Sequence, residues 1–282
     1  MEEYSALYFI SANESNPEGE LALNILISNI IEVATAHANS IGIGNPSMAH
    51  LGVGWVLSRL TVEMKRYPKC NTNYRLRTWV EDWNHHFSVR NFSIETEEGE
   101  ILGYARSIWM VLNMKTHEHY GLSHLYLPQE CVDRGRVCPI ARQGKHPVIL
   151  PFGSEIEEGS KNLVATSPDT LYRFQYNDID FYRHVNTVRY LTLLLNRYSL
   201  EDFDRCFVSR LELSFLHEGS FGMEVAIRRH YDPENQDTAS QNRDSSAQSH
   251  DVVEPEGITS FSIIDTAASR PILFSRFRLT AR

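Results

Sequence analysis

The stretch that is most informative about the fold is residues 177–190, which read Asn-Asp-Ile-Asp-Phe-Tyr-Arg-His-Val-Asn-Thr-Val-Arg-Tyr. In this stretch a polar loop gives way to the apolar stripe of a helix. Asp180, His184 and Asn186 supply a carboxylate, an imidazole and a carboxamide where that helix is expected to start. The free N–H groups of a helix start can hold a developing oxyanion beside acid–base groups, so the pattern favours hydrolysis. The alternative is an Asx turn with a capping carboxylate and a surface histidine.

The rest of the chain repeats one order of elements twice. In the first half an apolar stripe at helical spacing, Leu23 to Ala38, is followed by strand-like runs near 51–66, 73–83, 86–97 and 100–114. In the second half a stripe from Val188 to Tyr198 is followed by alternating strands through residue 281. An antiparallel sheet wrapped around a long helix buries such a stripe. The sequence therefore predicts an α+β protein made of two such units.

The expected units are residues 1–150, which include the start of a connector, and residues 151–282, which carry the motif quoted above. Residues 232–257 contain no large apolar residue before Val252, and we predict a mobile hairpin insertion there.

Composition narrows the function classes. The net charge of −9 and the pI of about 5.7 argue against general nucleic-acid binding. No apolar run approaches the roughly 18–20 residues that span a membrane. The acidic start of the chain does not resemble a signal peptide, and the cysteines Cys70, Cys131, Cys138 and Cys206 form no C-x-x-C pair. We therefore expect a cytoplasmic protein.

Other chemistry-bearing motifs are weak. His85-His86 and His117-x-His119 have no carboxylate or cysteine at ligand spacing, so we expect neither a metal nor a cofactor. The chain has no G-x-S-x-G elbow and no phosphate-binding loop, which disfavours an α/β-hydrolase or a nucleotide enzyme.

Several stretches in a fixed order carry a resemblance to a known family. They are residues 54–62, 66–68, 77–81, 105–113, 178–190 and 211–218. With them the chain resembles the acyl-acyl carrier protein thioesterases of plant plastids and their bacterial relatives. The resemblance implies two hotdog folds in tandem, with the chemistry in the second.

The resemblance also assigns roles to residues. The family pattern looks like D-x-D-x-N-x-H-V-N-N, which puts the catalytic aspartate on Asp180 and the catalytic histidine on His184. The catalytic asparagine falls on Tyr182, a departure, since tyrosine has no carboxamide. An acidic residue of the family falls on Glu218, without an adjacent cysteine.

Two further sets of residues complete the predicted site. The backbone N–H groups of Val185 and Asn186, at the helix start, are the expected oxyanion donors, although Asn186 suits a structural cap equally well. By resemblance, Trp55, Ser58 and Arg59 would line an acyl tunnel in the first unit; core packing is the alternative for Trp55.

The expected function is hydrolysis of fatty acyl-acyl carrier protein to free fatty acid and carrier thiol, which ends chain elongation. Asp180 or Glu218 would activate water and His184 would protonate the leaving thiolate, while direct attack by Asp180 is the alternative. The acidic carrier protein is the expected partner, and the protein is expected to be a monomer or a homodimer. The alternatives are an acyl-CoA thioesterase, a non-catalytic acyl-binding hotdog protein and a dehydratase.

Overall fold

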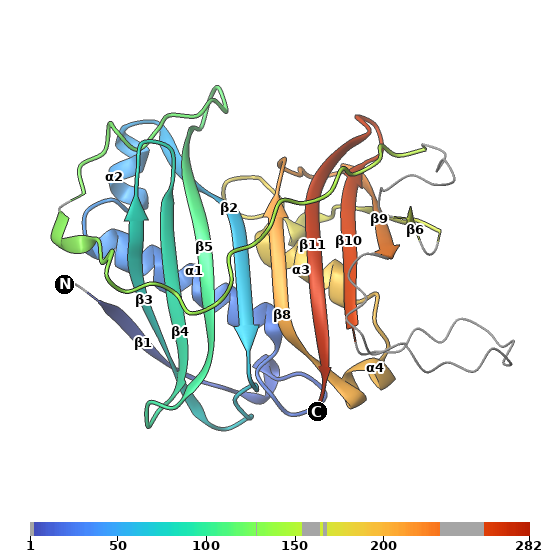
Figure 1. The fold of residues 1–282 in the computed structure, drawn as a ribbon. Helices are drawn as coiled ribbons and strands as arrows, with labels where there is room; N and C mark the ends of the chain where they lie inside the picture. The colour runs from blue at the N-terminus through green and yellow to red at the C-terminus, as the bar shows by residue number, and fades with distance from the viewer. Residues whose placement is uncertain (1–2, 128, 154–163, 166–167, 232–256) are drawn as a thin grey trace, which may run out of the picture. The chain divides into compact units, whose positions relative to one another are not determined.

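The computed structural model describes residues 3–127, 129–153, 164–165, 168–231 and 257–282. Contacts divide the chain into unit 1, Met1–Gln143, and unit 2, Gly144–Arg282. Each unit combines helices with an antiparallel sheet (Figure 1). The predicted insertion at 232–257 lies outside the described residues except for Gly257, which begins a strand.

Unit 1 contains the helix and strands expected from its sequence pattern. Its sheet has the order β1-β3-β4-β5-β2 with antiparallel neighbours. The elements are β1 (Tyr4–Phe9), α1 (Leu23–Ser40), α2 (Asn45–His50), β2 (Val53–Met64), β3 (Asn73–Trp83), β4 (Ser88–Thr96) and β5 (Ile101–Asn113), with the 3₁₀ turns η1 (Ala12–Glu14) and η2 (Gln129–Cys131).

The apolar stripe of α1 forms the core of unit 1. Its buried side chains follow helical spacing, and α1 contacts β1 and β3. The buried side chains of α1 are Leu23, Leu26, Ile27, Ile30, Val33, Ala34, His37 and Ala38. Gly42, at a φ of 78°, follows the end of the helix, where a left-handed residue is favoured. The predicted helix is thus confirmed, and a histidine lies within its buried stripe.

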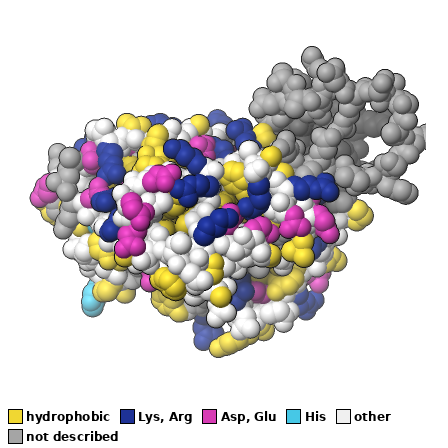
Figure 2. All heavy atoms as spheres, turned by 90° about the horizontal axis from the view of Figure 1, so that it is seen from below, with side chains coloured by type: hydrophobic (Ala, Val, Ile, Leu, Met, Phe, Trp, Pro, Cys, Tyr) yellow, Lys and Arg dark blue, Asp and Glu magenta, His cyan; other side chains and the backbone are white. Residues whose placement is uncertain are grey.

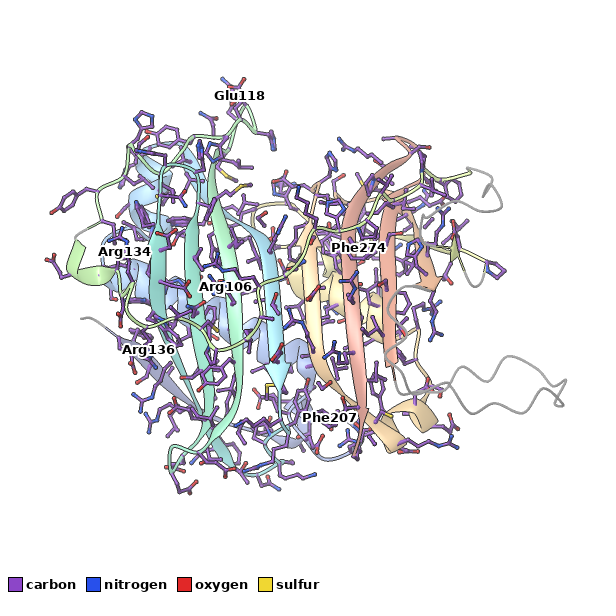
Figure 3. All side chains as sticks on the ribbon, in the orientation of Figure 1. Arg106, Glu118, Arg134, Arg136, Phe207 and Phe274 are labelled. Atoms are coloured by element: carbon purple, nitrogen blue, oxygen red, sulfur yellow. The ribbon has the colours of Figure 1, made fainter. Side chains whose placement is uncertain are left out.

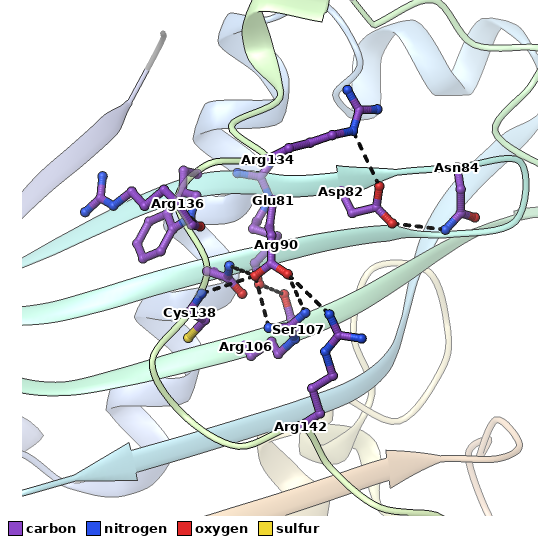
Figure 4. A network of polar contacts seen from close by, with 12 residues as sticks. Glu81, Asp82, Asn84, Arg90, Arg106, Ser107, Arg134, Arg136, Cys138 and Arg142 are labelled. Atoms are coloured by element: carbon purple, nitrogen blue, oxygen red, sulfur yellow. Dashed lines mark hydrogen bonds and ion pairs between the residues drawn. The ribbon is translucent and has the colours of Figure 1, made fainter.

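The opposite face of the unit 1 sheet is covered by the chain that follows β5 (Figure 4). The amide of Cys138 donates to Glu81, and the indole of Trp79 donates to the carbonyl of Arg136. Glu81 also accepts two hydrogen bonds from Arg106, at 2.7 and 3.0 Å, which makes a buried bidentate ion pair.

Unit 2 has its own antiparallel sheet in the order β8-β11-β10-β9, with both β6 and β7 paired to β9. The elements are β6 (Val164–Ala165), β7 (Thr170–Arg173), η3 (Tyr176–Asp178), α3 (Thr187–Leu195), α4 (Leu200–Arg205), β8 (Cys206–Phe215), β9 (Glu224–Tyr231), β10 (Gly257–Asp265) and β11 (Arg270–Ala281).

The helix of unit 2 is shorter than its apolar stripe predicts. α3 ends at Leu195, and Ser199 caps the short α4 through a capping box with Asp202. Tyr198 lies between the two helices, and its ring packs edge-on against Phe261 and Phe277. The stripe therefore continues into the core after the helix itself has ended.

Candidate active site

A short hairpin loop precedes α3 and carries the predicted catalytic residues. The amide of Asp180 donates to the carbonyl of His184 at 2.8 Å, and the amide of Arg183 donates back to the carbonyl of Asp180 at 3.0 Å. The side chain of Asp180 closes the same turn, because its Oδ1 accepts from the amides of Tyr182 and His184 at 2.9 and 3.2 Å. The Asx-turn alternative is thus part of how the site is built.

Arg183 holds an unusual backbone conformation in this loop. Its φ of 66° lies in the left-handed region. Arg183 is the last residue of a three-residue hairpin loop, a position that glycine normally occupies. A non-glycine residue at such an angle costs about 1–3 kcal/mol, and such strain gathers at functional sites.

The loop brings His184 next to Glu218. The imidazole Nε2 lies 3.3 Å from a carboxylate oxygen of Glu218, and the two side chains keep 29% and 35% of their surface exposed. Both groups are therefore paired and accessible. A carboxylate that accepts from an imidazole fixes the ring orientation and stabilises the charged ring during proton transfer.

The segment that carries Glu218 is joined to the loop by backbone and side-chain contacts. The amide of Val185 donates to the carbonyl of Gly219 at 2.9 Å, and the amide of Gly219 donates to the hydroxyl of Tyr190 at 2.9 Å. A Cβ at Gly219 would lie 2.6 Å from that hydroxyl, so only glycine fits. Burial raises the pKa of Tyr190, and the charges of Glu218 and Asp180 raise it further. Both carboxylates thus act on one hydroxyl.

The predicted oxyanion donors, the amides of Val185 and Asn186, already donate to carbonyl groups of the fold. The Val185 amide is used by Gly219, and the Asn186 amide donates to the carbonyl of Asp178 at 2.8 Å. Both N–H groups therefore have backbone acceptors in the fold, which the local sequence did not reveal. The side chain of Asn186 accepts from the amide of Val188, so Asn186 is the N-cap of α3.

Tyr182 contributes its backbone to the site. Its amide binds Asp180, while its side chain is 39% exposed and its ring lies against that of Phe181. Burial raises the pKa of Tyr182 and the charge of Asp180 raises it further, so the phenol stays neutral at neutral pH.

Unit 1 contains the same loop, which the sequence motif did not reveal. The amide of Asn16 donates to the carbonyl of Glu20, and the Gly19 amide donates to that of Asn16, as in the Asp180 loop. Oδ1 of Asn16 accepts from the amide of Glu20 at 2.8 Å, and Gly19 has a φ of 69°. The amide of Leu21 binds the carbonyl of Pro68, as that of Val185 binds Gly219.

The two loops share a conformation but differ in chemistry. Glu20 occupies the position of His184 and is ion-paired with Lys69 at 2.8 Å. Tyr67, which precedes Pro68, stands where Glu218 precedes Gly219. The loop fold therefore requires neither the histidine nor its carboxylate partner, and only unit 2 combines them at this position.

The predicted acyl-pocket residues separate in the structure. Trp55 lines a cavity of about 40 Å³ in unit 1, between the C-terminal half of α1 and the sheet, whereas Ser58 and Arg59 are not part of its lining. Ser58 is the extra residue where the register of β2 shifts against β5, between Leu57 and Arg59.

The histidines of unit 1 form no ligand set. The rings of His86 and His119 lie 5.6 Å apart, and across the described residues no group of three His, Cys, Asp or Glu side chains is placed to hold a metal ion. Among all the residues that the structure describes, no helix has the length and apolar character needed to cross a membrane.

Two family domains match consecutive parts of the chain. The acyl-ACP thioesterase N-terminal domain matches residues 1–122, and the acyl-ACP thioesterase C-terminal domain matches residues 161–264. Among curated relatives, an acyl-[acyl-carrier-protein] hydrolase of Cuphea viscosissima is 26% identical over 75% of this chain and 50% of its own length. A palmitoyl-acyl carrier protein thioesterase of Gossypium hirsutum is 26% identical over 76% of this chain and 52% of its own. The chain thus spans about half the length of these relatives.

Solved structures with a similar fold cover 99% of this chain. An acyl-ACP thioesterase from Bacteroides thetaiotaomicron has a TM-score of 0.74 at 23% identity and covers 99% of this chain and 98% of its own. The 12:0-ACP thioesterase from Umbellularia californica has a TM-score of 0.72 at 16% identity, over 99% of this chain and 94% of its own. The predicted α+β fold of two tandem hotdog domains is confirmed. Because the two family domains together match most of the sequence in the expected order, this chain belongs to the acyl-ACP thioesterase family.

Proposed function

We propose that this protein hydrolyses the thioester of fatty acyl-acyl carrier protein and releases a free fatty acid and the carrier thiol. The observation that carries the proposal is the His184–Glu218 pair at 3.3 Å, set on a loop whose counterpart in unit 1 lacks both groups. Family membership indicates the substrate class, because the relatives described above are named as acyl carrier protein hydrolases.

The residues divide the chemistry between them. Glu218 orients the imidazole of His184, which takes a proton from water as the water oxygen attacks the thioester carbonyl. The C–S bond then breaks, and His184 returns that proton to the leaving thiolate. Asp180 uses Oδ1 to hold the loop, and among the described residues its Oδ2 accepts no hydrogen bond, so it is available to orient the water.

An acidic carrier protein needs a basic surface on a chain whose net charge is −9. Arg183 on the loop and Arg189 on α3 are exposed, and neither pairs with a carboxylate of the described residues. Figure 2 shows Lys and Arg side chains gathered on one face, with Asp and Glu side chains among them. Local basic groups of this kind steer an acidic partner in a salt-dependent way.

We also assign the reaction to the cytoplasm. The four cysteines, Cys70, Cys131, Cys138 and Cys206, form no disulfide, as a reducing compartment would keep them.

The test is thiol release from acyl carrier protein thioesters, with acyl-CoA of the same chain length in parallel. His184→Asn and Glu218→Gln are expected to lower kcat/KM by at least about 100-fold, since general acid–base catalysis contributes 10²–10⁴. His217→Asn is the matched control, because His217 is adjacent to Glu218 and its ring binds the carbonyl of Pro271 instead. Wild-type rates in His184→Asn would contradict the proposed site. Faster turnover of acyl-CoA than of the carrier thioester would assign the alternative substrate.

A further inference from the structure

The repeat of the loop that carries His184 extends to the turn before it. In unit 2 the amide of Gln175 donates to Oδ2 of Asp178 at 2.7 Å, where η3 begins. In unit 1 the amide of Ser11 donates to Oε2 of Glu14 at 2.9 Å, where η1 begins. The spacing between turn and loop is the same in both units, so each position from the turn to the end of the loop has a counterpart in the other unit.

A second stretch, next to the loop, has a counterpart as well. The amide of Gly222, at a φ of 77°, donates to the carbonyl of Phe174 at 3.0 Å. The amide of Asn71, at a φ of 62°, donates to the carbonyl of Ile10 at 2.9 Å. Two left-handed residues thus stand at the same place in the two units, and the positions around them also correspond.

At four corresponding positions unit 2 has an aromatic side chain where unit 1 has none. The pairs are Tyr176 and Ala12, Phe181 and Pro17, Tyr182 and Glu18, and Phe221 and Cys70. We call the four aromatic residues the aromatic collar. Because unit 1 forms the same turn and loop without them, the aromatic collar is not required for the local backbone conformation.

The aromatic collar is exposed, unlike the phenylalanines that form the core of unit 2. Tyr176, Phe181 and Phe221 are 84%, 79% and 67% exposed, and Tyr182 is 39% exposed. Phe274, which Figure 3 marks on the sheet of unit 2, is only 2% exposed. At about 200 Å² for each aromatic side chain, the aromatic collar exposes on the order of 500 Å². Apolar patches of this size are often functional.

The aromatic collar lies beside the proposed catalytic pair, on both of the segments that form it. His184 and Ser220 make an antiparallel bridge, which places Phe221 next to the hairpin loop. On that loop the ring of Phe181 lies against the ring of Tyr182. The thioester must reach the catalytic pair, so the molecule that carries the thioester meets the aromatic collar as well.

Basic side chains accompany the aromatic collar. Arg183 and Arg189 are exposed, and neither pairs with a carboxylate of the described residues. The corresponding residues of unit 1 are Gly19 and Ile25, which carry no charge. Tyrosine, phenylalanine and arginine are the residue types enriched at protein–protein interfaces, and tyrosine and arginine often supply most of the binding energy. An acidic protein partner with an apolar patch therefore fits this surface.

We propose that the aromatic collar is the surface on which the carrier protein itself docks, and that it distinguishes a carrier thioester from a CoA thioester with the same acyl chain. The proposal rests on the hydrolysis proposed above for unit 2. Both substrates present the thioester on a pantetheine arm, but only the carrier adds a protein surface beyond that arm. Contacts between this protein surface and the aromatic collar favour the carrier thioester.

Binding of the carrier without an acyl group tests the proposal and needs no turnover. The probe is holo acyl carrier protein, titrated into the whole protein in a calorimeter. Tyr176→Ala and Phe221→Ser introduce small side chains, as unit 1 has at these positions, so both variants should fold with an unchanged Tm. We expect each to weaken carrier binding at least about tenfold, the effect of losing an interface hot spot.

Leu200→Ser is the matched control. Leu200 is 63% exposed and lies in α4, which follows the opposite end of α3 from the hairpin loop. This variant also replaces an exposed apolar side chain of unit 2, and it should bind the carrier as the wild type does. Carrier affinity that is unchanged in Tyr176→Ala and Phe221→Ser, or reduced equally in Leu200→Ser, would overturn the proposal.

Turnover then tests the distinction between the two thioesters. In Tyr176→Ala and Phe221→Ser, kcat/KM for the carrier thioester should fall at least about tenfold more than kcat/KM for acyl-CoA of the same chain length. Equal losses would contradict the proposal, and a larger loss with acyl-CoA would show that the aromatic collar holds the nucleotide instead. Binding to phosphatidylcholine vesicles that both variants lose, with carrier affinity unchanged, would assign the aromatic collar to a bilayer.

The two proposals for unit 2 fail in different ways. A wild-type protein that binds the carrier through the aromatic collar but hydrolyses no thioester would reject the hydrolysis and support the docking surface. A wild-type protein that hydrolyses the carrier thioester, with normal carrier binding in both variants, would reject only the docking surface.

Discussion

Asp180→Asn separates the two roles that the structure gives to Asp180. An asparagine keeps Oδ1, so it can still accept from the amides of Tyr182 and His184. Unit 1 already contains this substitution, because Asn16 accepts from Glu20 in the same turn. We therefore expect the free energy of unfolding to stay within about 0.5 kcal/mol of the wild type.

The catalytic effect of the same change should be large. The substituted carboxamide would present an NH₂ donor where Asp180 presents its second carboxylate oxygen, so the acceptor for water is lost. Loss of an assisting base costs about 10²–10⁴ in rate. We expect kcat/KM to fall at least about 100-fold, equivalent to about 2.7 kcal/mol of barrier, with most of the loss in kcat.

Asp180→Ala is the control, because it removes both the hydrogen bonds that Asp180 accepts in the turn and the acceptor for water. It deletes two hydrogen bonds worth about 1 kcal/mol each, so the free energy of unfolding should fall by about 2 kcal/mol. The measurements are urea unfolding and thiol release on the same preparations. Wild-type turnover in Asp180→Asn would reduce Asp180 to a turn residue. If Asp180→Asn were as unstable as Asp180→Ala, the parallel with Asn16 would be wrong.

Four further changes test the fold around the site, each by urea unfolding. Arg106→Met should cost about 3–5 kcal/mol, because buried Glu81 loses its bidentate partner and keeps only the more distant Arg142, at 3.9 Å, as a cation. Arg183→Gly should gain about 0.5 kcal/mol, since relief of a left-handed conformation worth about 1–2 kcal/mol exceeds the entropy cost of glycine. Gly219→Ala should lose about 1–3 kcal/mol from overpacking, and its turnover should fall as well. Because burial lowers the pKa of His37 from 6.5 to about 4, stability should fall as the pH drops through this range, by up to about 3 kcal/mol, and His37→Gln should flatten that profile.

Periodicity predicted the elements where one face is buried. The alternation that placed a strand at 73–83 is confirmed by β3, and the stripe that begins at Leu23 is confirmed by α1. It missed α2, because Pro46 reads as a helix breaker although it lies in the first turn, where proline is tolerated. Local patterns show where a helix is compatible with the chain, while tertiary contacts decide where it ends.

The candidate site was predicted only in part, for a similar reason. The resemblance named both His184 and Glu218, and their side chains lie next to each other in the structure. It did not indicate that the amide of Val185 donates to the carbonyl of Gly219, which belongs to a segment distant in sequence. A helix start that looks free in sequence is therefore already paired in the fold. The resemblance pointed to His184 and Glu218, whose side chains meet in the structure, and no sequence signal pointed to the hydrogen bonds that the backbone of the loop makes.

The sequence patterns also did not predict that the loop is repeated, because its two copies share almost no residue types. What they share is turn chemistry: a side-chain oxygen at Asn16 or Asp180, and a left-handed residue three positions later. Unit 1 places glycine there, whereas unit 2 retains the strained Arg183. A scaffold that folds with Gly19 and Glu20 does not need Arg183 and His184 for its shape. The residues that unit 2 adds at the expense of stability are therefore those we expect catalysis and carrier binding to require.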